Sequence, residues 1–114
     1  MPRVQPVALL IWLLSSPAFA AEAIEAVGAE KCGGAVKSYA VDFLAPEDRQ
    51  VEARAKVLRG GAEDARSTPA LSVDGKPCSD ARCAFRAIKG QTYKLSAEST
   101  AQNLENLCIS VTRP

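Results

Sequence analysis

Four cysteines set the strongest constraint on what this chain can fold into. Cys32, Cys78, Cys83 and Cys108 lie in a sequence of 114 residues, and four cysteines permit three disulfide pairings. Four residues separate Cys78 from Cys83, and they include a Ser-Asp pair that can turn the chain back to the Cα separation of about 5.5 Å that a disulfide needs. We therefore predict the pair Cys78–Cys83 and, by elimination, the pair Cys32–Cys108.

The cysteine spacing argues against redox and metal chemistry. Redox sites usually place two cysteines in a C-x-x-C motif, whereas Cys78 and Cys83 are more widely spaced. A four-cysteine zinc site needs two closely spaced pairs, and the sequence has one. We predict that all four cysteines are structural, with no metal ion and no cofactor.

The beginning of the chain indicates export, which makes disulfides available. Val7 to Leu14 is an apolar run, Arg3 precedes it, and Ala18-Phe19-Ala20 follows with small residues at both positions that signal peptidase reads. The run is shorter than the roughly 20 apolar residues of a membrane span. We predict a signal peptide over residues 1–20, no membrane span after its removal, and a periplasmic or secreted protein.

The mature chain carries no net charge. Removal of Arg3 leaves 13 basic residues (14 minus 1) against 13 acidic ones, and the two kinds are interleaved. Without a long-range field to attract polyanions, we predict no nucleic-acid partner. The apolar residues are largely Ala and Val, so the core of this small domain is thin and disulfides compensate for it.

Short segments with alternating apolar and polar residues predict strands. Turn residues such as Asp74-Gly75 and Lys89-Gly90 separate these segments. We expect an all-β domain over residues 36–114, a small antiparallel β-sandwich or barrel stapled by two disulfides, preceded by an N-terminal arm over residues 21–35. The expected strands cover residues 36–44, 70–73, 84–88, 92–97 and 107–111.

Residues 50–59 fit two patterns. As a strand, Val51, Ala53, Ala55 and Val57 share one face and charged residues share the other. As a helix, the segment begins near Pro46 and ends in basic residues and two glycines, which gives an α+β fold with a helix over 46–59. We favour the strand because the alternation is unbroken.

The absence of histidine limits catalysis. No Ser-His-Asp or Cys-His site can be built, and no histidine can bind zinc. Two carboxylate pairs, Glu47-Asp48 and Glu63-Asp64, lie in expected loops beside arginines, and nothing in the pattern buries them to raise a pKa as general acid catalysis requires. We predict no catalytic residue and a non-enzymatic protein.

What remains is a binding domain. We expect it to bind a protein partner, for example as an inhibitor of an extracellular hydrolase, through the polar loops at 60–69 and 98–106. The candidate binding residues in these loops are Arg66, Asn103 and Asn106. Two alternatives are an accessory module that binds carbohydrate or cell-envelope material through an exposed Tyr39 or Tyr93, and a small hydrolase that uses carboxylates.

The signal-peptide hypothesis has a direct test. Edman sequencing or intact mass of the exported protein is expected to place its first residue at Ala21. A folded, exported protein that still begins at Met1 would disprove the hypothesis.

Overall fold

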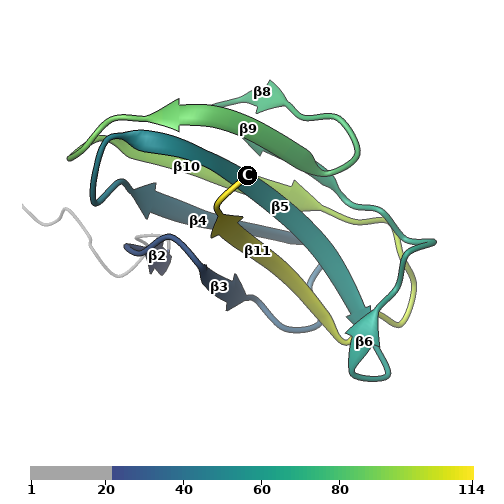
Figure 1. Cartoon of the computed structure of the whole chain (residues 1–114). Helices are drawn as coiled ribbons and strands as arrows, with labels where there is room; N and C mark the ends of the chain where they lie inside the picture. The colour runs from purple at the N-terminus through teal and green to yellow at the C-terminus, as the bar shows by residue number, and fades with distance from the viewer. Residues whose placement is uncertain (1–21) are drawn as a thin grey trace, which may run out of the picture.

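The protein is a β-sandwich. A computed structural model describes residues 22–114, which form two facing β-sheets, with no helix in this range. Figure 1 shows the two sheets packed across a common interior. The fold class predicted from the sequence is thus confirmed, while the predicted signal peptide, residues 1–20, lies outside the described residues.

The first sheet has five strands. In spatial order they are β2 (Glu22–Ile24), β4 (Ser38–Leu44), β10 (Thr92–Glu98), β7 (Ala70–Val73) and β8 (Lys76–Pro77). The pairs from β4 to β8 are antiparallel, and β2 runs parallel to β4. This parallel edge pair is the one departure of the sheet from the expected antiparallel arrangement.

The second sheet is built around one long strand. Its order is β3 (Ala29–Cys32), β11 (Asn106–Thr112), β5 (Arg49–Arg59) and β6 (Ala62–Glu63). A fifth strand, β9 (Arg82–Ala87), pairs with the first half of β5 on the same side as β6. All pairs in this sheet are antiparallel.

The ambiguous segment is a strand, so the alternative helix over 46–59 is wrong. Alternate residues of β5 from Val51 to Val57 are buried, and the residues between them are partly exposed. A helix would spread these four apolar side chains around its axis, whereas a strand places all of them in the interior. Pairing with β11 and β9 on its two sides then fixes the strand.

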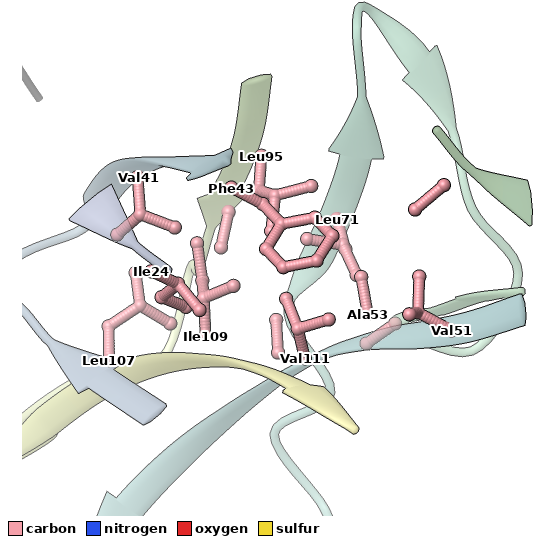
Figure 2. Packing of buried hydrophobic residues seen from close by; sticks show 14 of the residues in the cluster. Ile24, Val41, Phe43, Val51, Ala53, Leu71, Leu95, Leu107, Ile109 and Val111 are labelled. Carbon is pink, nitrogen blue, oxygen red and sulfur yellow. The ribbon is translucent and has the colours of Figure 1, made fainter. Parts of the chain in front are cut away.

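The core lies between the two sheets. Phe43 is its largest fully buried side chain, and small residues such as Ala53 and Ala97 allow the sheets to approach closely. Figure 2 shows side chains of both sheets meeting in this interior. The other large, fully buried side chains are Ile24, Val41, Val51, Val57, Leu71, Leu95, Leu107, Ile109 and Val111.

The described part of the expected N-terminal arm (21–35), residues 22–35, contributes a strand to each sheet. β2 pairs with β4 and buries Ile24, while β3 pairs with β11. β3 pairs with a segment far away in the sequence, and β2 runs parallel to its partner. A local pattern of alternation encodes neither pairing. The arm is therefore an integral part of the sandwich.

Both disulfides are present in the structure. Cys32 and Cys108 face each other in the β3–β11 ladder and are separated by 76 positions in the sequence. Cys78 and Cys83 close a short knuckle between β8 and β9. Within the knuckle, Asp80 and Ala81 both have left-handed φ angles, of 54° and 56°, which are unfavourable for alanine. The disulfide holds the two arms of this turn together.

Neighbouring residues of β5 offer a test of the sandwich. Ala53 is fully buried, so Ala53→Asp is expected to destabilise the domain by at least about 3 kcal/mol through an unpaired buried charge. Arg54 faces outward, and Arg54→Asp is expected to change the free energy of unfolding by only about ±0.5 kcal/mol. Urea denaturation measures the free energy of unfolding of both variants. Equal destabilisation by the two substitutions would contradict the assignment of Ala53 to the inner face and Arg54 to the outer face.

Candidate binding site beside strand β5

The neighbours of β5 on one side do not cover its whole length. β9 pairs with it as far as Arg54, and β6 begins to pair with it at Leu58. Between these points two isolated bonds remain: Ala55 N–H donates to the carbonyl of Ala81 (3.1 Å), and the carbonyl of Val57 accepts from Asp64 N–H (2.8 Å). The ladder is thus interrupted along one side of β5.

A hollow of about 280 Å³ lies at this interruption. We call it the β5 notch. Its walls come from residues 54–57 of β5, from the segment 63–69 and from the turn at 80–82. In an antiparallel strand the N–H and C=O of one residue point to the same side. The N–H of Val57 therefore points toward the notch, and no backbone acceptor in residues 22–114 is paired with it.

Two arginines stand side by side in the notch. Arg54 and Arg82 are directly opposite each other in the β5–β9 register, and both line the hollow. Like charges in this position repel. Among the described residues neither guanidinium has a carboxylate within 4.0 Å, while Lys56 beside them is neutralised by Glu30 at 2.9 Å. The arrangement can accept an anionic group from another molecule.

Asp64 builds the loop that forms the other wall of the notch. Its carboxylate accepts hydrogen bonds from Arg59 Nε (3.0 Å), Arg66 N–H (3.1 Å) and Ser67 Oγ (3.0 Å). Its carbonyl also accepts from Ser67 N–H at 3.1 Å. One side chain thus fixes residues 64–67 in a polar turn that has little apolar packing to support it.

These contacts determine what Asp64 can do chemically. The hydrogen bond from Arg59, then those from Arg66 and Ser67, hold the pKa of the Asp64 carboxyl below its usual range. A general acid in a glycosidase-type mechanism needs a raised pKa. Glu63 and Asp80 also line the notch, and both are exposed. The carboxylates of the notch are therefore suited to binding rather than to proton transfer.

Arg59 joins the two loops that the sequence suggested for binding. Besides Asp64 in the first loop, its guanidinium donates to the carbonyls of Gln102 (2.5 Å) and Asn103 (3.1 Å) in the second. A second hollow, of about 610 Å³, adjoins the notch and is lined by Arg59, Arg66 and residues 63, 64 and 67. Arg59 thus links the two loops through its hydrogen bonds.

The three candidate residues have different surroundings. Arg66 lines the second hollow with an exposed side chain. Asn103 is exposed, has a left-handed φ of 56°, and contributes its carbonyl to Arg59. Asn106, at the start of β11, uses its side-chain oxygen to accept Gly34 N–H at 2.7 Å. Arg66 and Asn103 thus lie on the loop surface, and the Asn106 side chain supports a turn.

Both tyrosine side chains are partly buried. The ring of Tyr39 packs so closely on Gly33 that a Cβ there would lie 2.4 Å from it, and its hydroxyl donates to Glu22. Burial, followed by this contact with Glu22, raises the Tyr39 pKa. Tyr93 packs on Phe85 with ring centroids 5.0 Å apart, and its hydroxyl accepts Ile88 N–H at 2.8 Å. Both rings belong to the edge of the core.

One group of metal-ligand types occurs in the described part of the chain. Glu30, Cys32 and Cys108 lie close together on the second sheet, but the two sulfurs are bonded to each other. A disulfide has no thiolate to offer a metal ion. Within residues 22–114 there is also no helix with the length and apolar character to cross a membrane.

The sandwich resembles a known domain type. No protein-family model matches the chain, and no curated protein sequence matches it. Its fold is similar to the crystal structure of the pre-peptidase C-terminal domain of a collagenase from Bacillus anthracis, with a TM-score of 0.54. The match covers 81% of this chain and 94% of that one, at 11% sequence identity. This likeness establishes the fold that the two domains share.

The structure adds three arginines to the residues considered in the sequence and gives Asp64, considered there as one of a carboxylate pair, a structural role. Arg54, Arg59, Asp64 and Arg82 define the notch and the adjoining loops. The role of Asp64 had one signal in the sequence. An aspartate three residues before a serine, as in Asp64 and Ser67, is typical of a turn that the aspartate side chain caps. The approach of Arg54 to Arg82 depends on the β5–β9 register, which the sequence alone does not reveal.

The role of Asp64 predicts a pH dependence. Because its pKa is lowered in the folded state, its contribution to the loop is present above the ordinary aspartate pKa of about 4 and is lost as the pH falls through the lower folded value. NMR titration should show the Arg66 amide shifting with the Asp64 carboxyl. Asp64→Asn should mobilise residues 64–67 at neutral pH.

Asp80→Asn is the matched control, because Asp80 lines the same notch in a left-handed conformation that asparagine tolerates. An unchanged loop in Asp64→Asn, or equal mobilisation in the control, would contradict the assigned role.

Proposed function

We propose that this protein is an exported, non-catalytic domain that binds a protein partner through the β5 notch and the adjoining 60–69 and 98–106 loops. One observation carries the proposal. Among the described residues no carboxylate lies within 4.0 Å of the guanidinium of Arg54 or Arg82, which face each other in a hollow toward which the Val57 N–H also points. Two guanidinium groups and a backbone donor suit an acidic side chain supplied by another protein.

The surroundings of the notch favour a protein over a carbohydrate. Sugar recognition commonly uses an exposed aromatic face, whereas both tyrosines are partly buried, pack against the core and lie outside the notch. The notch is instead lined by charged side chains and by a polar loop held in place by Asp64. Charge-assisted hydrogen bonds with a partner's side chains are the interactions such a surface supplies.

The comparison supports an accessory role. The similar domain is named as the pre-peptidase C-terminal domain of a collagenase. Together with two disulfides, which persist in oxidising compartments, this favours a periplasmic or secreted location for the present chain. Inhibition of an extracellular hydrolase is one form that partner binding would take.

The carboxylate-hydrolase alternative has less support. Three acidic residues line the notch, but the pKa of Asp64 is lowered and the other two side chains are exposed. Nothing in this arrangement provides the protonated acid that hydrolysis by a carboxylate pair requires.

Affinity capture tests the proposal. With mature protein as bait, a partner from the envelope or culture fluid of the source is expected to be retained and then lost in the double variant Arg54→Ser, Arg82→Ser. Arg66→Ala is expected to weaken capture. The melting temperature should stay within a few degrees, since surface substitutions usually change stability by about ±0.5 kcal/mol.

Lys94→Ser is the matched control, because it removes an exposed cation from the other sheet. Equal capture by the double variant and the control would contradict the proposal. So would steady multiple-turnover hydrolysis that disappears in Glu63→Gln or Asp80→Asn.

A further inference from the structure

β9 is the longest strand at an edge of either sheet. It has six residues and pairs with β5 alone. The other edge strands are β3 with four residues, β2 with three, and β6 and β8 with two each. Short edge strands give another chain little to pair with, and β9 departs from this pattern.

The register identifies which backbone groups of β9 are free. The carbonyl of Ala81 accepts from β5, while Arg82 N–H points away from β5 and donates to Ser79 (3.0 Å). Because strand residues alternate, Cys83, Phe85 and Ala87 bond to β5, and Ala84 and Arg86 direct their N–H and C=O outward. These outward groups have no backbone partner in residues 22–114.

The two sides of this edge differ in chemistry. On the outer face of the sheet, Arg82, Ala84 and Arg86 are all exposed. A hollow of about 320 Å³ runs along β9, lined on the inner side by the apolar residues Val73, Phe85 and Tyr93. Asp74 and Lys76 of the neighbouring turn also line it, as do Ala84 and Arg86 of β9 itself. Phe85 contacts both Phe43 and Tyr93, so the apolar side of the hollow is continuous with the core.

We infer that β9 binds an extended segment of a protein partner by β-strand addition. The added strand pairs with the outward groups of Ala84 and Arg86, places alternate apolar side chains over Phe85, and places acidic side chains beside Arg82 and Arg86. The inference rests on the proposed function in taking a protein as the partner. It adds a second contact surface and the sequence pattern of the segment, with alternating apolar and acidic residues.

Charge disfavours a second copy of this chain as the occupant in the register centred on Ala84. An antiparallel β9–β9 pair centred on Ala84 would place Arg82 of one copy directly opposite Arg86 of the other, twice. Like charges in directly opposite positions are destabilising. The same two arginines that oppose self-pairing attract an acidic strand.

The test uses a synthetic peptide of the length of β9 in which valine alternates with aspartate, and a control peptide with lysine for aspartate. Isothermal calorimetry with the mature protein should detect the aspartate peptide and show little binding of the lysine peptide. In NMR experiments, the amides of Ala84 and Arg86 should become protected from hydrogen exchange when the peptide is bound.

Ala84→Pro removes one outward N–H without removing a bond to β5, and proline is tolerated on an edge. It should weaken peptide binding about tenfold or more, since it removes a hydrogen bond and blocks close pairing. Ala84→Val keeps the N–H and should bind as the unmodified protein does. Arg86→Glu should weaken binding of the aspartate peptide and favour the lysine peptide.

Several results would overturn the inference. The first is equal binding of the aspartate peptide by Ala84→Pro and Ala84→Val. The second is equal binding of the two peptides, and the third is a lack of protection of the Ala84 and Arg86 amides. Self-association abolished by Ala84→Pro would assign the edge to a second copy. The peptide assay needs no natural partner, and position 84 lies outside the notch. Failure here therefore leaves the capture experiment on Arg54 and Arg82 to decide the proposed function separately.

Discussion

The alternation of side chains along β5 organises most of the second sheet and part of the core. Alternate residues from Val51 to Val57 fill the interior with small and medium apolar groups, and the intervening polar residues face outward. The strand is longer than any of its neighbours. β11 covers one side, but β9 and β6 share the other and leave a space between them. The strand that supports the fold therefore also creates the notch.

Local patterns in the sequence predicted much of this architecture. Ala70–Val73 is a strand with the bounds expected, and the alternation through residues 50–59 correctly favoured a strand. The pairing of β2 with β4 was not predicted. The predicted disulfide brought Cys32 to Cys108 in the last strand, but the sequence did not predict that residues 29–32 themselves form a strand beside β11. These pairings are decided by which distant segment completes each sheet, and Glu22–Ile24 is too short to carry a readable alternation.

The candidate site was harder to predict for the same reason. The polar loops were visible in the sequence, and the Asp64–Ser67 turn had a recognisable spacing. The contact of Arg59 with the carbonyls of residues 102 and 103 crosses more than 40 positions. Arg54 lies opposite Arg82 only because β5 and β9 pair in one particular register. Such features follow from topology, so composition indicated only a mixed-charge surface.

That surface is uneven even though the whole chain has a net charge of only +1. Arg54, Arg82 and Arg86 project from neighbouring positions of one sheet face. Glu52 lies on the same face, two residues before Arg54 and directly opposite Ala84. A cluster of this size produces a local field that acts within about 10 Å at ordinary salt. Recognition by this face is therefore expected to be short-ranged and salt-dependent, without the long-range steering of a strongly charged protein.

The disulfide between β3 and β11 has a mechanical consequence. Cys32 and Cys108 enclose every residue from 33 to 107 in a covalent loop. A pulling force applied at the two ends of the chain would pass through this bond and bypass residues 33–107. β2, most of β3 and the second half of β11 lie outside the loop and would bear the load, whereas the notch and the β9 edge lie within it and would be shielded from direct tension. Reduction of that one bond would transfer the force to the hydrogen-bonded strands.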